Sequence, residues 1–120
     1  MLKRKEQAVK KLCDVFGMSY LKLGPLECDF KLLSNASVPI GYAQVVEVDG
    51  MIRYSYPLSI SIQDLSLLKS KVMNPIIIWA CDDGILYTKI KDTYGTFRWY
   101  NNDLHLFFTK QKNIKFIKYV

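Results

Sequence analysis

The chain has 120 residues, of which half are hydrophobic and 23% are charged, and its formal net charge is +6. This length suits one domain, residues 1–120, and the composition excludes a disordered or fibrous chain. The longest apolar run, residues 75–81, is shorter than the roughly 18–20 residues that span a bilayer, which argues against a membrane protein. No secretory signal follows the basic start, so we expect a cytoplasmic protein. The positive charge is compatible with a polyanionic partner such as DNA.

Three cysteines, Cys13, Cys28 and Cys81, are widely separated and include no Cys-x-x-Cys pair. An odd number at such spacings argues against both a disulfide framework and a zinc site. We therefore expect reduced thiols in the core of the protein.

Apolar residues at three- and four-residue spacing predict a first helix, which Gly17 ends. These apolar positions are Leu2, Val9, Leu12, Cys13 and Phe16. Glu6 lies at the border of this apolar stripe. The helix therefore carries an acidic side chain close to the face that is expected to pack on the rest of the domain.

Two strands are predicted after this helix. Alternation predicts a strand over residues 28–33, in which Asp29 and Lys31 share one face. A second strand follows over residues 40–48. One face of that strand presents Tyr42, Gln44, Val46 and Val48.

The remaining elements follow from turns and caps. Asp49-Gly50 is typical of a hairpin turn and predicts a third strand over residues 51–56. Ser61 and Asp64 form a capping box that begins a second helix, which extends to about Lys71. Residues 76–80 lack polar alternation and predict a central strand covered on both faces. Further strands are predicted over residues 85–90, 96–100, 104–108 and 114–119.

The order α-β-β-β-α-β-β with a β-rich C-terminal tail resembles the PD-(D/E)XK nuclease superfamily, in particular its small phage-encoded members. The likeness covers roughly residues 5–91. It depends on Glu6 in the first helix, Asp29 in Leu26-Glu27-Cys28-Asp29-Phe30, Gly41-Tyr42-Ala43-Gln44-Val45-Val46 in the second strand, and Tyr56-Pro57-Leu58-Ser59-Ile60-Ser61 before the second helix. The resemblance implies an α/β domain of the restriction-endonuclease-like type, with a central mixed sheet flanked by helices.

The resemblance also implies residue roles. In that superfamily the aspartate and the first residue of the E-x-K pair bind a magnesium ion, and the lysine orients or helps to deprotonate the attacking water. Position by position, Asp29 matches the metal-binding aspartate, Gln44 the acid, Val46 the lysine and Glu6 the helix glutamate. Gln44 brings no charge to a metal, and Val46 can neither donate a hydrogen bond nor carry charge. Mg²⁺ or Mn²⁺, held by Asp29 and Gln44, is therefore expected only if catalysis survives.

A substitute for the missing lysine is Lys31, which lies two residues after Asp29 on the same strand face. The alternative interpretation of Lys31 is a solvent-exposed strand residue. A shifted register that uses Glu47 with Asp49 is disfavoured, because these residues project away from Gln44 and Asp49 suits a turn. The catalytic candidates are thus Glu6, Asp29, Gln44 and Lys31.

Other polar and aromatic residues have structural interpretations. Asp82-Asp83-Gly84 is typical of a turn and not of an acid–base pair. His105 is the only histidine and has no second ligand at metal-binding spacing. Trp79 is expected in the core, whereas Trp99 suits either the core or a surface on which unpaired bases stack.

Two basic clusters at the ends of the chain are candidates for a phosphate-binding rim. The candidate nucleic-acid-binding residues are Lys3, Arg4, Lys10, Lys110, Lys112, Lys115 and Lys118. They are separated in sequence by the whole predicted domain, so a common rim requires the fold to bring the two ends together.

Three functions fit these observations. The first is a phage or mobile-element nuclease-like protein that binds DNA or a partner protein and has weakened or lost catalysis. The second is an active Mg²⁺-dependent DNA endonuclease that uses Glu6, Asp29, Gln44 and a migrated Lys31. The third is a non-catalytic protein-interaction module, such as an inhibitor of a host defence system. The sequence leaves the oligomeric state open, a dimer included.

Overall fold

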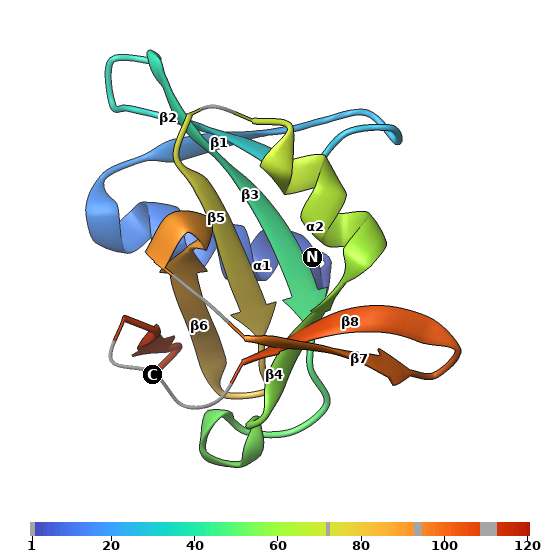
Figure 1. Cartoon of the computed structure of the whole chain (residues 1–120). Coiled ribbons are helices and arrows are strands. Elements are labelled where there is room, and N and C mark those ends of the chain that lie inside the picture. Colours follow the sequence, from blue (N-terminus) through green and yellow to red (C-terminus); the bar gives the residue numbers. More distant parts are fainter. Residues whose placement is uncertain (1, 72, 93–94, 109–112) are drawn as a thin grey trace.

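The computed structural model describes residues 2–71, 73–92, 95–108 and 113–120. Its helices are α1 (Arg4–Phe16) and α2 (Ile62–Lys69), and its strands are β1 (Ser19–Lys22), β2 (Phe30–Leu33), β3 (Pro39–Glu47), β4 (Leu58–Ser61), β5 (Pro75–Ala80), β6 (Gly84–Lys89), β7 (Thr96–Tyr100), β8 (Asp103–Phe108) and β9 (Lys115–Lys118). The chain is an α/β protein with a mixed main sheet and a second, smaller sheet (Figure 1).

The main sheet has six strands in the order β1-β2-β3-β5-β6-β9. Strands β1, β2 and β3 form an antiparallel meander, and β5 then pairs parallel to β3. A parallel neighbour requires a crossover connection, and here β4 and α2 supply it. Strands β6 and β9 complete the sheet in antiparallel pairing.

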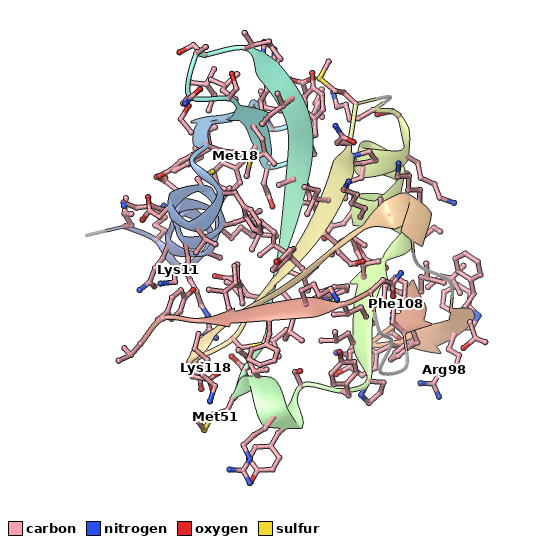
Figure 2. All side chains as sticks on the ribbon, turned by 90° about the vertical axis from the view of Figure 1, so that its left-hand side faces the viewer. Lys11, Met18, Met51, Arg98, Phe108 and Lys118 are labelled. Carbon is pink, nitrogen blue, oxygen red and sulfur yellow. The ribbon has the colours of Figure 1, made fainter. Side chains whose placement is uncertain are left out.

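Helices and the second sheet cover the two faces of the main sheet. Helix α1 buries Val9 and Leu12 against Phe30, Val45 and other apolar residues of one face. The opposite face packs against α2 and against the antiparallel sheet β4-β8-β7. In Figure 2, Lys11 on α1 and Arg98 on β7 accordingly lie on opposite sides of the main sheet.

Local signals placed both helices correctly. Helix α1 ends where the chain enters the left-handed region at Gly17 (φ 66°), whose N–H bonds to the carbonyl of Cys13. Helix α2 begins after Ser61, whose Oγ accepts a hydrogen bond from the N–H of Asp64 at 3.2 Å. Ser61 therefore caps the helix as predicted, although the helix ends at Lys69 and not at Lys71.

The predicted third strand over residues 51–56 is wrong. This segment contains a 3₁₀ turn, Ile52–Tyr54, and Ile52 is buried. The N–H of Ile52 donates to Asp83 Oδ1 at 2.8 Å, and the N–H of Asp82 donates to the carbonyl of Gly50 at 2.8 Å. The segment after Gly50 is therefore bonded to the β5–β6 turn and does not return along β3.

Strand β1 was not predicted. Its four residues are mostly exposed, so they show no hydrophobic alternation. Pairing with β2 alone defines this edge strand, with Lys22 opposite Phe30. The meander therefore has three strands, as many as the sequence indicated, but β1 before β2 replaces the predicted strand after β3.

The cysteine prediction is confirmed, because Cys13, Cys28 and Cys81 are all free and buried. Burial raises the pKa of Cys13 and of Cys81 to about 11 and also raises the pKa of Cys28. None of the helices in the described residues is both long and apolar enough to cross a membrane.

These thiols are expected to be unreactive in the folded protein. At pH 8, well below pKa values of about 11, almost none of the Cys13 or Cys81 thiol is the reactive thiolate. Native protein should release almost no thionitrobenzoate from Ellman's reagent, whereas protein in guanidinium chloride should release three equivalents, one for each cysteine. Rapid labelling of native protein would contradict the buried placement.

Candidate functional site

Asp29 lies at the point where β2 and β3 separate, immediately before the first residue of β2. Asp29 Oδ2 accepts a hydrogen bond from the N–H of Val45 at 2.9 Å. In return, Gln44 Oε1 accepts a hydrogen bond from the N–H of Asp29 at 2.9 Å. The structure therefore brings the two predicted residues together on neighbouring segments, each side chain bonded to the other segment's backbone.

A lysine also lies beside Asp29, but it is Lys5 of α1 and not the predicted Lys31. Lys5 Nζ lies 3.3 Å from Asp29 Oδ2 and 3.4 Å from Oδ1. Lys31 is half-buried on β2, opposite Tyr42. Sequence reasoning considered only same-strand neighbours of Asp29, and it missed Lys5 although Lys5 directly precedes the candidate Glu6.

These residues line a cleft of about 490 Å³ that is bounded by the start of α1, the β1–β2 connection and the end of β3. Its charged residues are Lys3, Lys5, Glu6, Lys22, Glu27, Asp29 and Glu47. Lys31 does not line it. The cleft thus combines three lysines with four carboxylates, and the predicted members are Lys3, Glu6 and Asp29.

Besides Asp29, two more of the cleft's carboxylates have partners. Glu6 Oε2 accepts a hydrogen bond from the hydroxyl of Tyr20 at 3.4 Å, and burial together with the Glu6 charge raises the pKa of Tyr20. Glu27 pairs with Lys71 Nζ at 3.0 Å. By contrast, the side chains of Lys3, Lys22 and Glu47 have no hydrogen-bond or ion-pair partner among the residues that the structure describes.

The donor atoms around Asp29 do not fit a magnesium site. Mg²⁺ demands octahedral oxygen ligands and usually one or two carboxylates. The Asp29 carboxylate is bonded to Lys5 and to the Val45 N–H, and the Gln44 oxygen is directed at the Asp29 N–H. Within the described ranges, no three side chains of the His, Cys, Asp or Glu type are grouped so as to hold a metal.

Val46 has no part in this cleft. It lies opposite Trp79 in the β3–β5 register and packs, half-buried, against the apolar cluster on the α2 side of the sheet. The position that matches the family's lysine is therefore apolar in its surroundings as well as in its side chain.

Two members of the predicted N-terminal basic cluster, Arg4 and Lys10, lie outside the Asp29 cleft. Arg4 donates from Nη2 to the carbonyl of Val48 at 2.6 Å and pairs with Asp82 at 2.8 Å, so it links α1 to two loops. Lys10 pairs with Asp14 at 2.8 Å along α1. Of the basic cluster at the start of the chain, the cleft contains Lys3 and Lys5.

The C-terminal cluster lies elsewhere. Lys115 and Lys118 are exposed on β9, at the opposite edge of the main sheet from β1 and its loop. Lys110 and Lys112 lie outside the described residues. Arg4 and Tyr119 nevertheless line one pocket, so the two ends of the chain approach each other there, outside the cleft that contains Lys3 and Lys5.

The structure agrees with the structural interpretations of the Asp82-Asp83 turn, of His105 and of Trp79. Asp82 and Asp83 lie in the β5–β6 turn, where they bond to Arg4 and to the N–H of Ile52. His105 Nδ1 lies 3.1 Å from Ser59 Oγ, so the imidazole has a partner within the small sheet. Trp79 is fully buried, whereas Trp99 is 76% exposed and is not a core residue.

The chain matches no family model, no curated protein and no solved structure. A nuclease-like assignment therefore depends on the order of the strands and on the residues around Asp29.

Proposed function

We propose that this chain is a nuclease-like DNA-binding protein, of the kind encoded by phages or mobile elements, in which metal-dependent cleavage is weakened or lost. The observation that carries the proposal is the Lys5–Asp29 ion pair at 3.3 Å in the cleft between α1 and β3. Lys5 is ion-paired with the carboxylate that would otherwise bind the metal. Gln44 is neutral, so it cannot supply the missing negative charge. The meander β1-β2-β3 followed by α2 and parallel β5 supports the proposed ancestry.

The cleft retains the means to bind a phosphate. Lys3 and Lys22 are not engaged by other described side chains, and both line the cleft with Lys5. The Lys5–Asp29 pair is partly exposed, with 40% and 22% of the two side chains accessible, so it contributes little stability and can exchange for a phosphate contact. The formal net charge of the whole chain, +6, is compatible with a nucleic acid as the ligand, and DNA inside a cell would place the protein in the cytoplasm.

One observation favours the alternative of an active endonuclease. Lys5 lies within 3.4 Å of both Asp29 oxygens, so α1 supplies a lysine where the family's site requires one. This alternative uses Asp29, Glu6 and Gln44 with Lys5 in the role that Lys31 was expected to take. It requires the Lys5–Asp29 pair to open for a metal.

Asp29→Asn separates the two functions. An asparagine keeps an oxygen that accepts from the Val45 N–H but releases Lys5, so we expect wild type and variant alike to leave plasmid, linear and branched DNA uncut in Mg²⁺ or Mn²⁺. The variant should bind duplex DNA about 3- to 10-fold more tightly and increase the slope of log K against log salt by about one.

Asp14→Asn is the matched control. Like Asp29→Asn, it removes one negative charge and releases one lysine, but that lysine is Lys10 on α1, which lies outside the cleft. It should change affinity by less than about 2-fold. Cleavage by wild type that is lost in Asp29→Ala would establish the active endonuclease in place of our proposal.

A further inference from the structure

A second cleft, of about 510 Å³, lies between the small sheet and the segment that follows β3. Its walls include Tyr54 from the 3₁₀ turn and Tyr100, His105 and Phe107 from the β7–β8 hairpin. Figure 1 shows this hairpin extending from the body of the molecule, so its rings are carried beyond the main sheet. Aromatic side chains in an open cleft offer flat apolar surface to a ligand.

The hairpin rings hold one another in place. The Tyr100 ring meets the His105 ring edge-on at 5.3 Å and the Phe107 ring at 5.9 Å. The Arg98 guanidinium lies 4.2 Å from the centre of the Phe107 ring, and Ser59 fixes the imidazole of His105. Tyr100 nevertheless remains 52% exposed, so part of a positioned ring is free to stack on a ligand.

Carboxylates mark one border of this cleft. Glu47 and Asp49 both line it, and neither side chain has a hydrogen-bond or ion-pair partner in the part of the chain that the structure describes. A carboxylate repels a phosphate but accepts hydrogen bonds from the amino group of cytosine. The lining therefore suits a neutral base and disfavours the phosphate backbone.

The two clefts are neighbours, since Glu47 lines both. Lys3, Lys5 and Lys22 lie in the first cleft, and the aromatic rings lie in the second. A single-stranded segment can place its backbone along the lysines and turn a base toward the rings, which duplex DNA cannot do without unpairing.

We infer that the second cleft binds an unpaired base of single-stranded DNA by stacking on Tyr100, with Asp49 accepting a hydrogen bond from the base. This inference rests on the proposed function, because the lysine cleft must hold the adjacent phosphate. It gives the protein a preference for unpaired or branched DNA over continuous duplex, and for cytosine over thymine, whose carbonyl at the corresponding position is an acceptor.

The test is fluorescence anisotropy with labelled oligodeoxycytidylate of about 12 nucleotides and with a mixed-sequence duplex at one salt concentration. Tyr100→Ala should weaken binding of the single strand by about 5- to 100-fold and leave duplex binding within 2-fold. Phe97→Ala is the matched control, because Phe97 is on the same strand and equally exposed, at 52%, but on the opposite face, paired with Leu106. It should change neither affinity. Asp49→Asn should reduce the preference for oligodeoxycytidylate over oligothymidylate.

The outcomes separate this inference from the proposed function. If wild type binds DNA and Tyr100→Ala binds the single strand equally well, the base site is overturned and the lysine cleft stands. If wild type binds neither DNA, both proposals fall. If an arginine-rich peptide binds wild type and Tyr100→Ala abolishes that binding, the cleft belongs to a cationic protein partner and the base site is overturned.

Discussion

Replacing Lys3 and Lys22 together by glutamate is expected to weaken duplex DNA binding by about 100-fold at low salt and to reduce the salt slope by about two. Both side chains line the cleft beside Asp29 and have no partner among the described residues, so they are free to contact phosphates. Each lost contact removes one counterion-release step, and each glutamate adds repulsion. Titration of labelled duplex at several salt concentrations measures both quantities.

The matched control is Lys115→Glu with Lys118→Glu. These lysines are also exposed, and the change in net charge is the same, but they lie on β9 at the opposite edge of the main sheet. Screening over about 8–10 Å limits their effect on a phosphate in the cleft, so we expect a loss below about 5-fold. An equal loss of duplex affinity in both variants would mean that DNA also contacts the C-terminal lysines, and the cleft would not be the specific phosphate site.

The expectation that Asp29 and Gln44 lie together came from the resemblance to a family, and the local pairing of two successive strands explains why they do. A turn-rich stretch between two alternating segments indicates antiparallel neighbours, and the observed register places Phe30 opposite Ala43. Asp29 is then adjacent to Gln44. The prediction needed no knowledge of how the sheet packs on the helices.

Lys5 and Glu47 could not be placed in the same way. The contact between Lys5 and Asp29 depends on the angle at which α1 crosses the sheet, which no sequence spacing defines. Glu47 was set aside because a regular strand directs it away from Gln44, yet it lies at the end of β3, where β2 has already diverged. A residue at an open strand end can line a cleft that an interior residue of the same face cannot reach.

The false strand over residues 51–56 has a similar cause. Asp49-Gly50 is a turn, as predicted, but the partner edge of β3 is occupied by β5, which arrives later in the chain. The N–H of Ile52 is satisfied instead by Asp83. The residue types of Asp49-Gly50 thus explain the turn itself. The structure after the turn depends on which strand pairs with β3, and that strand comes later in the chain.

Trp79→Ala is expected to reduce the free energy of unfolding by about 3–5 kcal/mol. Trp79 is fully buried on β5, its ring meets Phe108 edge-on at 5.6 Å, and its Nε1–H donates to the carbonyl of Ser59 at 2.9 Å. Truncation removes apolar contacts in the core and leaves the Ser59 carbonyl without this donor. Urea denaturation measures the loss, and Trp99→Ala, at a side chain 76% exposed, should stay within about 0.5 kcal/mol of wild type.

Trp79→Phe tests how the tryptophan connects the two sheets. Phenylalanine keeps a ring against Phe108 but lacks the donor to Ser59, a β4 residue that also fixes His105 in the aromatic cleft. We expect a smaller loss of stability, about 1–2 kcal/mol, because the partly buried carbonyl of Ser59 loses this donor. Below the unfolding transition, single-strand affinity should fall more than duplex affinity, since the small sheet carries the rings and the lysine cleft does not depend on it. A uniform loss of both affinities would mean that Trp79 supports the whole fold and not the second cleft in particular.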